Sequence, residues 1–170
     1  FWESSTVRVH ESGEVTVYVG TSSPGTGIKT THSQIIADQL GVDIDDISIH
    51  EGKDTERAPD GTGSIGSRSG PVGGGSLKQS VDKVIKKSKR IVAHELEAPV
   101  GDIEFDDGEF FVAGDPSQSM ALTDVAVESR IATNLPEEME PGLEATSYYD
   151  PENFTWAFGT HVVAVEVDPD

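Results

Sequence analysis

The residues with the clearest potential for chemistry lie in two loops rich in glycine, serine and threonine, at residues 21–27 and 61–76. Each loop follows a run typical of a β-strand and precedes a run typical of a helix. Glycine lets backbone N–H groups approach a ligand closely, and the N-terminus of the following helix favours negative charge. The second loop adds Ser67, Arg68 and Ser69, whose hydroxyl groups and forked guanidinium suit phosphate oxygens. Together the two loops predict a clamp for a phosphorylated cofactor.

Neither loop carries a complete nucleotide-binding signature. The first loop contains Gly25-Thr26-Gly27, but it lacks both the ending of a P-loop and the third glycine of a dinucleotide-binding turn. Taken alone, it fits a tight structural turn equally well. Arg68 also has an alternative role, because a surface ion pair suits a chain with this many carboxylates.

The sequence places no nucleophile beside a base. His32 falls on the helix expected after the first loop, where a packed or surface histidine is the commoner outcome. His161 falls in an apolar run, where a histidine of the core is expected. The five histidines are scattered and there is no cysteine, which excludes thiolate metal sites and disulfides within the chain. We therefore predict a binding scaffold with no catalytic residue and no metal held by protein side chains.

Composition restricts the partners of the chain. Its 170 residues allow one domain, or a lobed domain with two small cores. Thirty-one acidic residues against 12 lysines and arginines give a formal net charge of −19, which repels nucleic acids and anionic lipids. No apolar run approaches the roughly 18 residues that cross a membrane. The acidic residues are spread through loops and turns, as in proteins of a salt-rich cytoplasm. The alternative is an acidic domain of a mesophile.

The first half of the chain is typical of a ββαβα unit. Its strands and helices are expected, in order, at residues 6–10, 14–19, 31–40, 45–51 and 76–97. Thr30 or Thr31 is suited to cap the first helix, and Gly41 is suited to end it. Six of the 12 bases lie in the second helix, which predicts either a solvated face or a surface for an acidic partner or a phosphate.

The second half of the chain is richer in strands. The expected elements are a hairpin at 102–105 and 109–112, a helix at 122–129, a loop at 135–142, and strands at 144–149 and 160–167. The fold class is therefore α+β, with mixed sheets and helices packed on them. Two lobes are expected, at residues 1–98 and 99–170, and both glycine loops lie in the first.

These residues resemble a known family. The matching segments follow in order at residues 15–22, 25–42, 51–55, 61–75 and 158–168, and the Gly-Ser-Arg-Ser run at 66–69 is the most specific. They resemble the molybdenum-cofactor-binding subunit of the xanthine dehydrogenase and aldehyde oxidase family. The most similar branch is the large subunit of aerobic carbon monoxide dehydrogenases.

The resemblance implies a cofactor and the residues that hold it. The cofactor would be molybdopterin, extended as a cytosine dinucleotide. The implied binding residues are Gly25, Thr26, Gly27 and Thr30 in the first segment and Gly66, Ser67, Arg68 and Ser69 in the second. The sequence departs from the family at several positions. Thr26 stands where a glutamine is usual, and Pro24 precedes the Gly25-Thr26-Gly27 motif. Gly70 replaces a threonine, and Lys53 resembles an insertion.

The resemblance also implies a larger enzyme. Such enzymes hydroxylate a carbon centre with water as the oxygen source, and carbon monoxide, aldehydes and N-heterocycles all remain open as substrates. Partner subunits would carry FAD and 2Fe-2S clusters, in a cytoplasmic dimer of heterotrimers. The family's catalytic glutamate lies beyond the position of Asp170, so the chain is expected to be an inactive fragment of the cofactor-binding domain. The alternatives are a non-enzymatic nucleotide- or phosphate-binding module and a structural module.

Overall fold

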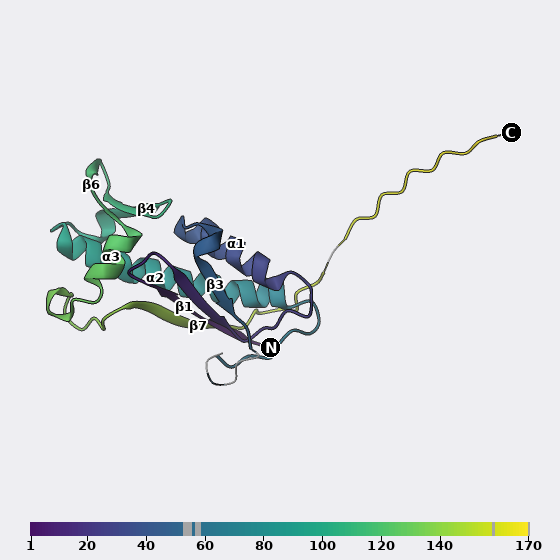
Figure 1. Ribbon diagram of the computed structural model, residues 1–170, viewed down its shortest axis with the longest axis horizontal. Coiled ribbons are helices and arrows are strands. Elements are labelled where there is room, and N and C mark those ends of the chain that lie inside the picture. Colours follow the sequence, from purple (N-terminus) through teal and green to yellow (C-terminus); the bar gives the residue numbers. More distant parts are fainter. Residues whose placement is uncertain (53–55, 57–58, 158, 170) are drawn as a thin grey trace.

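A four-stranded mixed sheet forms the centre of the molecule (Figure 1). The computed structural model describes residues 1–52, 56, 59–157 and 159–169. The sheet has the order β3-β2-β1-β7, and its strands are β1 (Glu3–Val9), β2 (Val15–Val19), β3 (Ile47–His50) and β7 (Leu143–Tyr149). β1 is antiparallel to β2 and β7, whereas β3 is parallel to β2. The parallel pair needs a crossover connection, and α1 provides it.

Two helices cover one face of this sheet. They are α1 (Ile28–Leu40) and α2 (Gly74–Glu95), which contact the sheet and each other. β1 and β2 alternate, so that Val7 and Val17 are buried on the helix side while Arg8 is turned to the other face. None of the helices in the described residues is long and apolar enough to cross a membrane.

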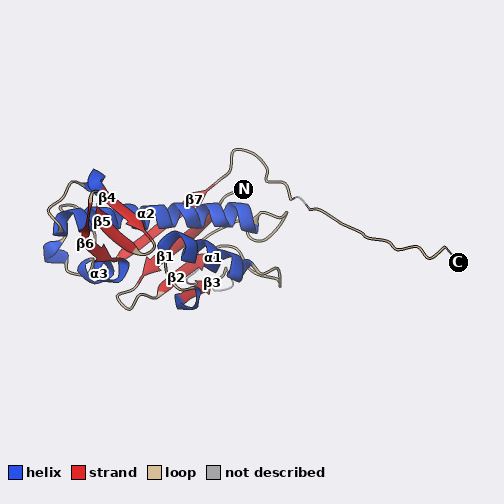
Figure 2. Ribbon diagram, turned by 90° about the horizontal axis from the view of Figure 1, so that it is seen from above, coloured by secondary structure: helices blue, strands red, loops and turns tan. Residues whose placement is uncertain are grey.

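A smaller antiparallel sheet lies at the far end of α2 (Figure 2). It has the order β4-β5-β6, with β4 (Ile103–Asp106), β5 (Glu109–Val112) and β6 (Asp115–Ala121), and it is followed by α3 (Leu122–Glu128). Short helical turns cover Ile44–Asp46, Ser69–Gly73, Val100–Asp102 and Ala132–Asn134, and the second of these is a π-helical turn.

Both sheets share one core. The same cluster of buried apolar side chains contains Val7 and Val17 of the larger sheet and Ile103 and Phe110 of the smaller one. The boundary expected between residues 98 and 99 therefore does not separate the sheets, because β7 lies beyond it and pairs with β1. The predicted α+β class, with mixed sheets and helices packed on them, is confirmed.

Most of the expected elements are present, with shifted ends. The hairpin of β1 and β2, the hairpin of β4 and β5, β3, α3 and β7 lie close to the predicted ranges. α1 begins at Ile28 and α2 at Gly74, because the glycine loops themselves run into helix. β6 was not predicted, since Pro116 and the polar run after it do not resemble a strand.

The strand predicted at residues 160–167 is wrong. No strand is assigned among residues 159–169, which extend away from the rest of the molecule (Figure 1). The apolar alternation is present, but no described strand lies alongside to accept its backbone hydrogen bonds. His161 is accordingly exposed, so the expectation of a core histidine there is also wrong.

Candidate functional site

The two glycine loops are hydrogen-bonded to each other at one end of the strands of the larger sheet. The backbone N–H of Ser22 donates to Ser64 Oγ at 2.9 Å, and that hydroxyl donates to Ser22 O at 2.5 Å. In addition, Gly52 N donates to Thr21 O at 3.0 Å. These bonds fix the loop after β2 against the loop that leads to α2.

The first loop ends at an uncapped helix N-terminus. Gly27 is the N-cap residue of α1, in the left-handed region at φ 75°, and no side chain accepts from the first turn. Neither Thr30 nor Thr31 is the cap, because both lie within the helix that Gly27 begins. The Thr31 hydroxyl instead donates to Gly27 O at 3.2 Å. The first N–H groups of a helix have no intrahelical acceptor, and this turn contains no acidic residue. The N-terminus of α1 is therefore available to an anion.

The second loop presents an exposed apex at residues 64–67. Gly63, Gly66 and Ser67 have positive φ values of 88°, 56° and 58°. A serine in this region is uncommon, and Arg68 after it is right-handed. Alternation between Ser67 and Arg68 is the backbone pattern of an anion-binding concavity, although the N–H of Arg68 itself donates to Ile65 O at 3.3 Å. The apex is thus a second candidate site for negative charge.

Arg68 does not extend from this apex toward solvent. Arg68 is 6% exposed, and its guanidinium forms an ion pair with Glu3, which is 0% exposed. Nη1 also donates to Gly63 O at 2.7 Å, while Nη2 donates to Phe1 O at 2.6 Å and to Trp2 O at 2.9 Å. Arg68 therefore forms an ion pair, which was the alternative to phosphate binding, but this pair is buried and does not lie at the surface.

The structure thus divides the predicted binding residues into two groups. The exposed group comprises Gly25, Thr26, Gly27, Thr30, Gly66 and Ser67. Arg68 and Ser69 are buried. Ser69 O lies 3.3 Å from Nε2 of His32, which makes a hydrogen bond when that nitrogen carries the proton. His32 thereby connects α1 to the second loop.

Comparison with known proteins identifies the family. Residues 2–170 match the sequence pattern described as the molybdopterin cofactor-binding domain. The chain belongs to this family. The large chain of carbon monoxide dehydrogenase from Afipia carboxidovorans is 41% identical over 169 residues, which are 99% of this chain and 20% of that protein. Subunit gamma of the 6-hydroxypseudooxynicotine dehydrogenase complex from Paenarthrobacter nicotinovorans is 36% identical over 169 residues, which are 99% of this chain and 21% of that protein. The chain spans about a fifth of these relatives.

Solved structures agree with the assignment to the molybdopterin cofactor-binding domain. The Cu,Mo-CO dehydrogenase in its carbon monoxide reduced state has a TM-score of 0.83 at 42% identity, covering 89% of this chain and 19% of that one. Quinoline 2-oxidoreductase from Pseudomonas putida 86 has a TM-score of 0.79 at 36% identity, with coverages of 89% and 19%. The resemblance predicted from the sequence is confirmed. Its segments at Lys53, Asp54, Thr55 and Phe158 lie outside the described residues.

The loops of this molybdopterin cofactor-binding domain fit an anionic group. A Cβ added at Gly25, Gly27 or Gly66 would meet no atom within 4 Å, so the backbone there is open. Open backbone beside an uncapped helix N-terminus is suited to phosphate oxygens. Among the described residues, no group of three histidine or carboxylate side chains is placed to hold a metal ion.

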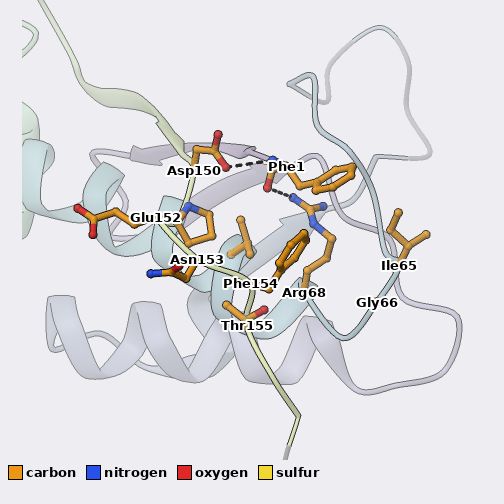
Figure 3. A pocket seen from close by; sticks show the side chains of 11 residues that line it. Phe1, Ile65, Gly66, Arg68, Asp150, Glu152, Asn153, Phe154 and Thr155 are labelled. Carbon is orange, nitrogen blue, oxygen red and sulfur yellow. Dashed lines mark hydrogen bonds and ion pairs between the residues drawn. The ribbon is translucent and has the colours of Figure 1, made fainter.

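A cavity of about 460 Å³ lies beside the apex of the second loop (Figure 3). Phe1, Ile65 and Phe154 form its apolar walls, and residues 150–155 close one side. Gly66 and Arg68 line the side that belongs to the loop. The cavity therefore adjoins the anion-binding apex and offers apolar surface next to it.

A second hollow lies on the basic face of α2. Lys83, Lys86, Lys87 and Arg90 line it together with Glu138, Glu140 and Glu144. Lys83 Nζ donates to Thr146 O at 2.7 Å, and Lys87 Nζ donates to Gly142 O at 2.5 Å. Two of these ammonium groups are thus engaged with the protein, and carboxylates surround the rest, which makes this face a weaker anion site than the loops.

The sequence did not single out His32 as a residue of the site. The imidazole is buried, and its Nδ1 has no hydrogen-bond partner in the part of the chain that the structure describes. A Cβ at Gly73 would lie 3.2 Å from His32 Nε2 and 3.2 Å from Thr21 Cγ2, so the ring packs between the two loops. Burial lowers the pKa of His32, against the opposing effects of the bond to Ser69 and the charge of Glu51. The only sequence signal was its position one turn into α1.

We expect His32 to make stability depend on pH. Because its folded pKa is lowered, the unfolded chain takes up a proton below the ordinary value of 6.5 while the folded chain resists. Stability therefore falls as the pH drops through that value. Thermal melts between neutral and mildly acidic pH should show a flatter slope for His32→Gln than for the wild type. The exposed His94→Gln is the control and should keep the wild-type slope. Equal slopes for all three proteins would contradict the expectation.

Proposed function

We propose that this chain holds and orients the molybdopterin cofactor in a molybdenum hydroxylase of the xanthine dehydrogenase and aldehyde oxidase family. The observation that carries the proposal is the uncapped N-terminus of α1, tied through Ser22 and Ser64 to the open apex of the second loop. Exposed backbone N–H groups from both loops, at one end of the strands of the larger sheet, suit a ligand with several anionic oxygens. The family match supports the identity of that ligand.

Each exposed loop residue has a proposed role. Gly25, Gly27 and Thr30, with Thr26 between them, supply backbone N–H and hydroxyl donors at the start of α1. Gly66 and Ser67 supply donors from the second loop, with Ser69 beside them. We propose the cytosine dinucleotide form of the cofactor. When bound, the cofactor supplies the molybdenum centre at which a substrate carbon is hydroxylated with oxygen from water.

The activity of the whole protein is also a proposal, since the chain spans about a fifth of its relatives. The relatives named above are dehydrogenase or oxidoreductase components, which favours an enzyme over a non-enzymatic phosphate-binding or structural module. We propose oxidation of carbon monoxide, an aldehyde or an N-heterocycle. Partner subunits would carry FAD and 2Fe-2S clusters in a dimer of heterotrimers, and the chain alone would be inactive.

Cofactor analysis of the full-length protein tests this proposal. Molybdenum measured by elemental analysis and cytidine monophosphate released by acid hydrolysis should each be stoichiometric with the large subunit. The 170-residue chain prepared in the same host is the control and should hold neither. A full-length protein free of both, from a host whose other molybdenum enzymes are loaded, would contradict the proposed function. Stoichiometric molybdenum on the short chain would contradict its dependence on the remaining subunit.

We further propose that the protein works in the cytoplasm of a halophilic organism, on the basis of its net charge of −19. Repulsion among the carboxylates weakens as salt screens them, and the screening length falls to about 3 Å at about 1 M salt. The melting temperature should therefore rise steeply as sodium chloride approaches that concentration. Sucrose of matched osmolality is the control and should raise it less. A melting temperature that ignores salt would contradict halophilic adaptation.

A further inference from the structure

The carboxylate of Glu3 occupies a space that exists only because two glycines face it. Glu3 begins β1 and is fully buried. A Cβ added at Gly20 would lie 2.7 Å from Glu3 Oε2, and one at Gly61 would lie 2.1 Å from the same oxygen. A carboxylate buried at this depth is unfavourable unless charge and hydrogen bonds compensate it. The second loop supplies that compensation to Oε1, whereas Oε2 is buried and has no hydrogen-bond partner among the described residues.

Both ends of the loop apex bind the same oxygen of Glu3. The backbone N–H of Gly63 donates to Glu3 Oε1 at 2.7 Å, and Arg68 Nη1 donates to it in the buried ion pair. Arg68 Nη1 also donates to Gly63 O at 2.7 Å. Residues 63 and 68 are thereby held together through one carboxylate. The apex between them is closed into a small ring.

The remaining donors of Arg68 are also occupied or covered. Nη2 donates to Phe1 O and Trp2 O, which ties the loop to the start of β1. Thr62 Oγ1 donates to Trp2 O at 3.0 Å and adds to the same attachment. Nε is buried and has no hydrogen-bond partner among the described residues. Each N–H donor of the guanidinium is therefore either hydrogen-bonded to the protein or buried, and none is free to bind a ligand at the apex.

We propose that Glu3 and Arg68 form a positioning pair that holds the apex, residues 64–67, in the shape that presents the backbone N–H groups of Gly66 and Ser67 to an anion. Arg68 acts through the loop and is not itself the anion ligand. The nature of that anion rests on the proposed function, whereas the positioning of the apex is a property of the chain alone. Removal of either partner would leave the other charge buried without its opposite charge, supported by backbone hydrogen bonds alone, and would loosen the apex.

Substitution of Glu3 separates this proposal from direct binding by Arg68. If the guanidinium bound the anion, Glu3→Gln would remove a competing negative charge and strengthen anion binding. If the pair positions the apex, Glu3→Gln weakens anion binding although a negative charge has been removed. The two accounts thus predict opposite signs for a substitution that preserves the size of the side chain.

The test uses the ¹⁵N-labelled chain and the variants Glu3→Gln, Arg68→Gln, Arg68→Lys and the double glutamine variant. Without ligand, the amide signals of residues 63–68 should shift and their hydrogen exchange should accelerate, while those of β2 stay unchanged. If the apex then keeps its competent shape about a tenth of the time, the dissociation constant for inorganic pyrophosphate rises about tenfold. The double variant should lose no more affinity for pyrophosphate than either single variant does. Arg68→Lys, which keeps the charge opposite Glu3, should recover part of the order.

The matched control is Arg8→Gln, which removes an exposed ion pair between the same strand and Glu144. It should leave unchanged both the amide signals and exchange of residues 63–68 and the dissociation constant for pyrophosphate. Apex signals that do not respond to Glu3→Gln would overturn the proposal, as would tighter pyrophosphate binding by Glu3→Gln. If the apex loosens but the wild type binds no pyrophosphate, the positioning pair is supported and the proposed anion-binding function fails. Should Arg68→Gln not fold, the comparison of Glu3→Gln with Arg68→Lys decides in the same way.

Discussion

Replacement of Gly41 by alanine is expected to destabilise the fold by about 2–5 kcal/mol, as the sum of about 1–2 kcal/mol of backbone strain and about 1–3 kcal/mol of overpacking. Gly41 ends α1 in the left-handed region at φ 63°, and its N–H donates to Ala37 O at 2.9 Å. An added Cβ would lie 2.3 Å from the backbone of Asp107 and 2.3 Å from that of Gly108. These atoms belong to the turn between β4 and β5, so relief of the clash would separate the end of α1 from the smaller sheet.

Gly114→Ala is the matched control, because Gly114 also has a positive φ, of 84°, but no atom lies within 4 Å of its added Cβ. It should cost only the backbone strain, about 1–2 kcal/mol. Urea unfolding monitored by circular dichroism measures both variants. Equal losses would show that contact between α1 and the β4–β5 turn contributes nothing to stability.

Thr30→Glu is expected to weaken anion binding by about tenfold, or about 1.4 kcal/mol, while leaving the fold more stable. Thr30 lies in the exposed first turn of α1, where no acidic residue is present. A carboxylate there interacts favourably with the helix N-terminus, a gain of about 0.3–1 kcal/mol. The same carboxylate repels an anion that uses the same N–H groups. Isothermal titration with inorganic pyrophosphate and thermal melts measure the two effects.

Gln34→Glu is the control for Thr30→Glu. Gln34 is exposed on the same helix one turn further along, so the variant adds the same charge away from the N-terminus. It should reduce the affinity for pyrophosphate less, because its carboxylate lies about 6 Å further along the axis and the electrostatic effect of the helix N-terminus falls off within the first turn. Equal losses of affinity in the two variants would show that the effect comes from net charge and that the N-terminus of α1 does not bind the anion.

Local signals predicted the elements around the loops. The β-branched runs of β1 and β2 and the glycine at the end of α1 have local causes, and these predictions are confirmed. The strand at 160–167 failed because alternation predicts a strand only when a neighbouring strand is available. The N-cap of α1 failed because two threonines looked better suited than Gly27, whose role follows from the path of the loop before it.

The interior of the site was beyond prediction for a similar reason. Arg68 was expected near phosphate because its type and neighbours suit one, but Glu3 is 65 residues away in sequence and nothing local pairs the two. His32 was interpreted as a packed or surface residue, and its position between the loops depends on the contact with Ser69, 37 residues away. Contacts between distant segments decide which polar groups are hydrogen-bonded within the protein and which remain free to bind a ligand.

The two glycine loops are proposed to bind the anionic part of the cofactor. Titration of the ¹⁵N-labelled chain with inorganic pyrophosphate tests this binding, because each amide reports its own environment. We expect saturable shifts confined to the start of α1, residues 25–31, and to residues 66–69. Shifts confined to Lys83, Lys86, Lys87 and Arg90 on α2, with both loops silent, would contradict it.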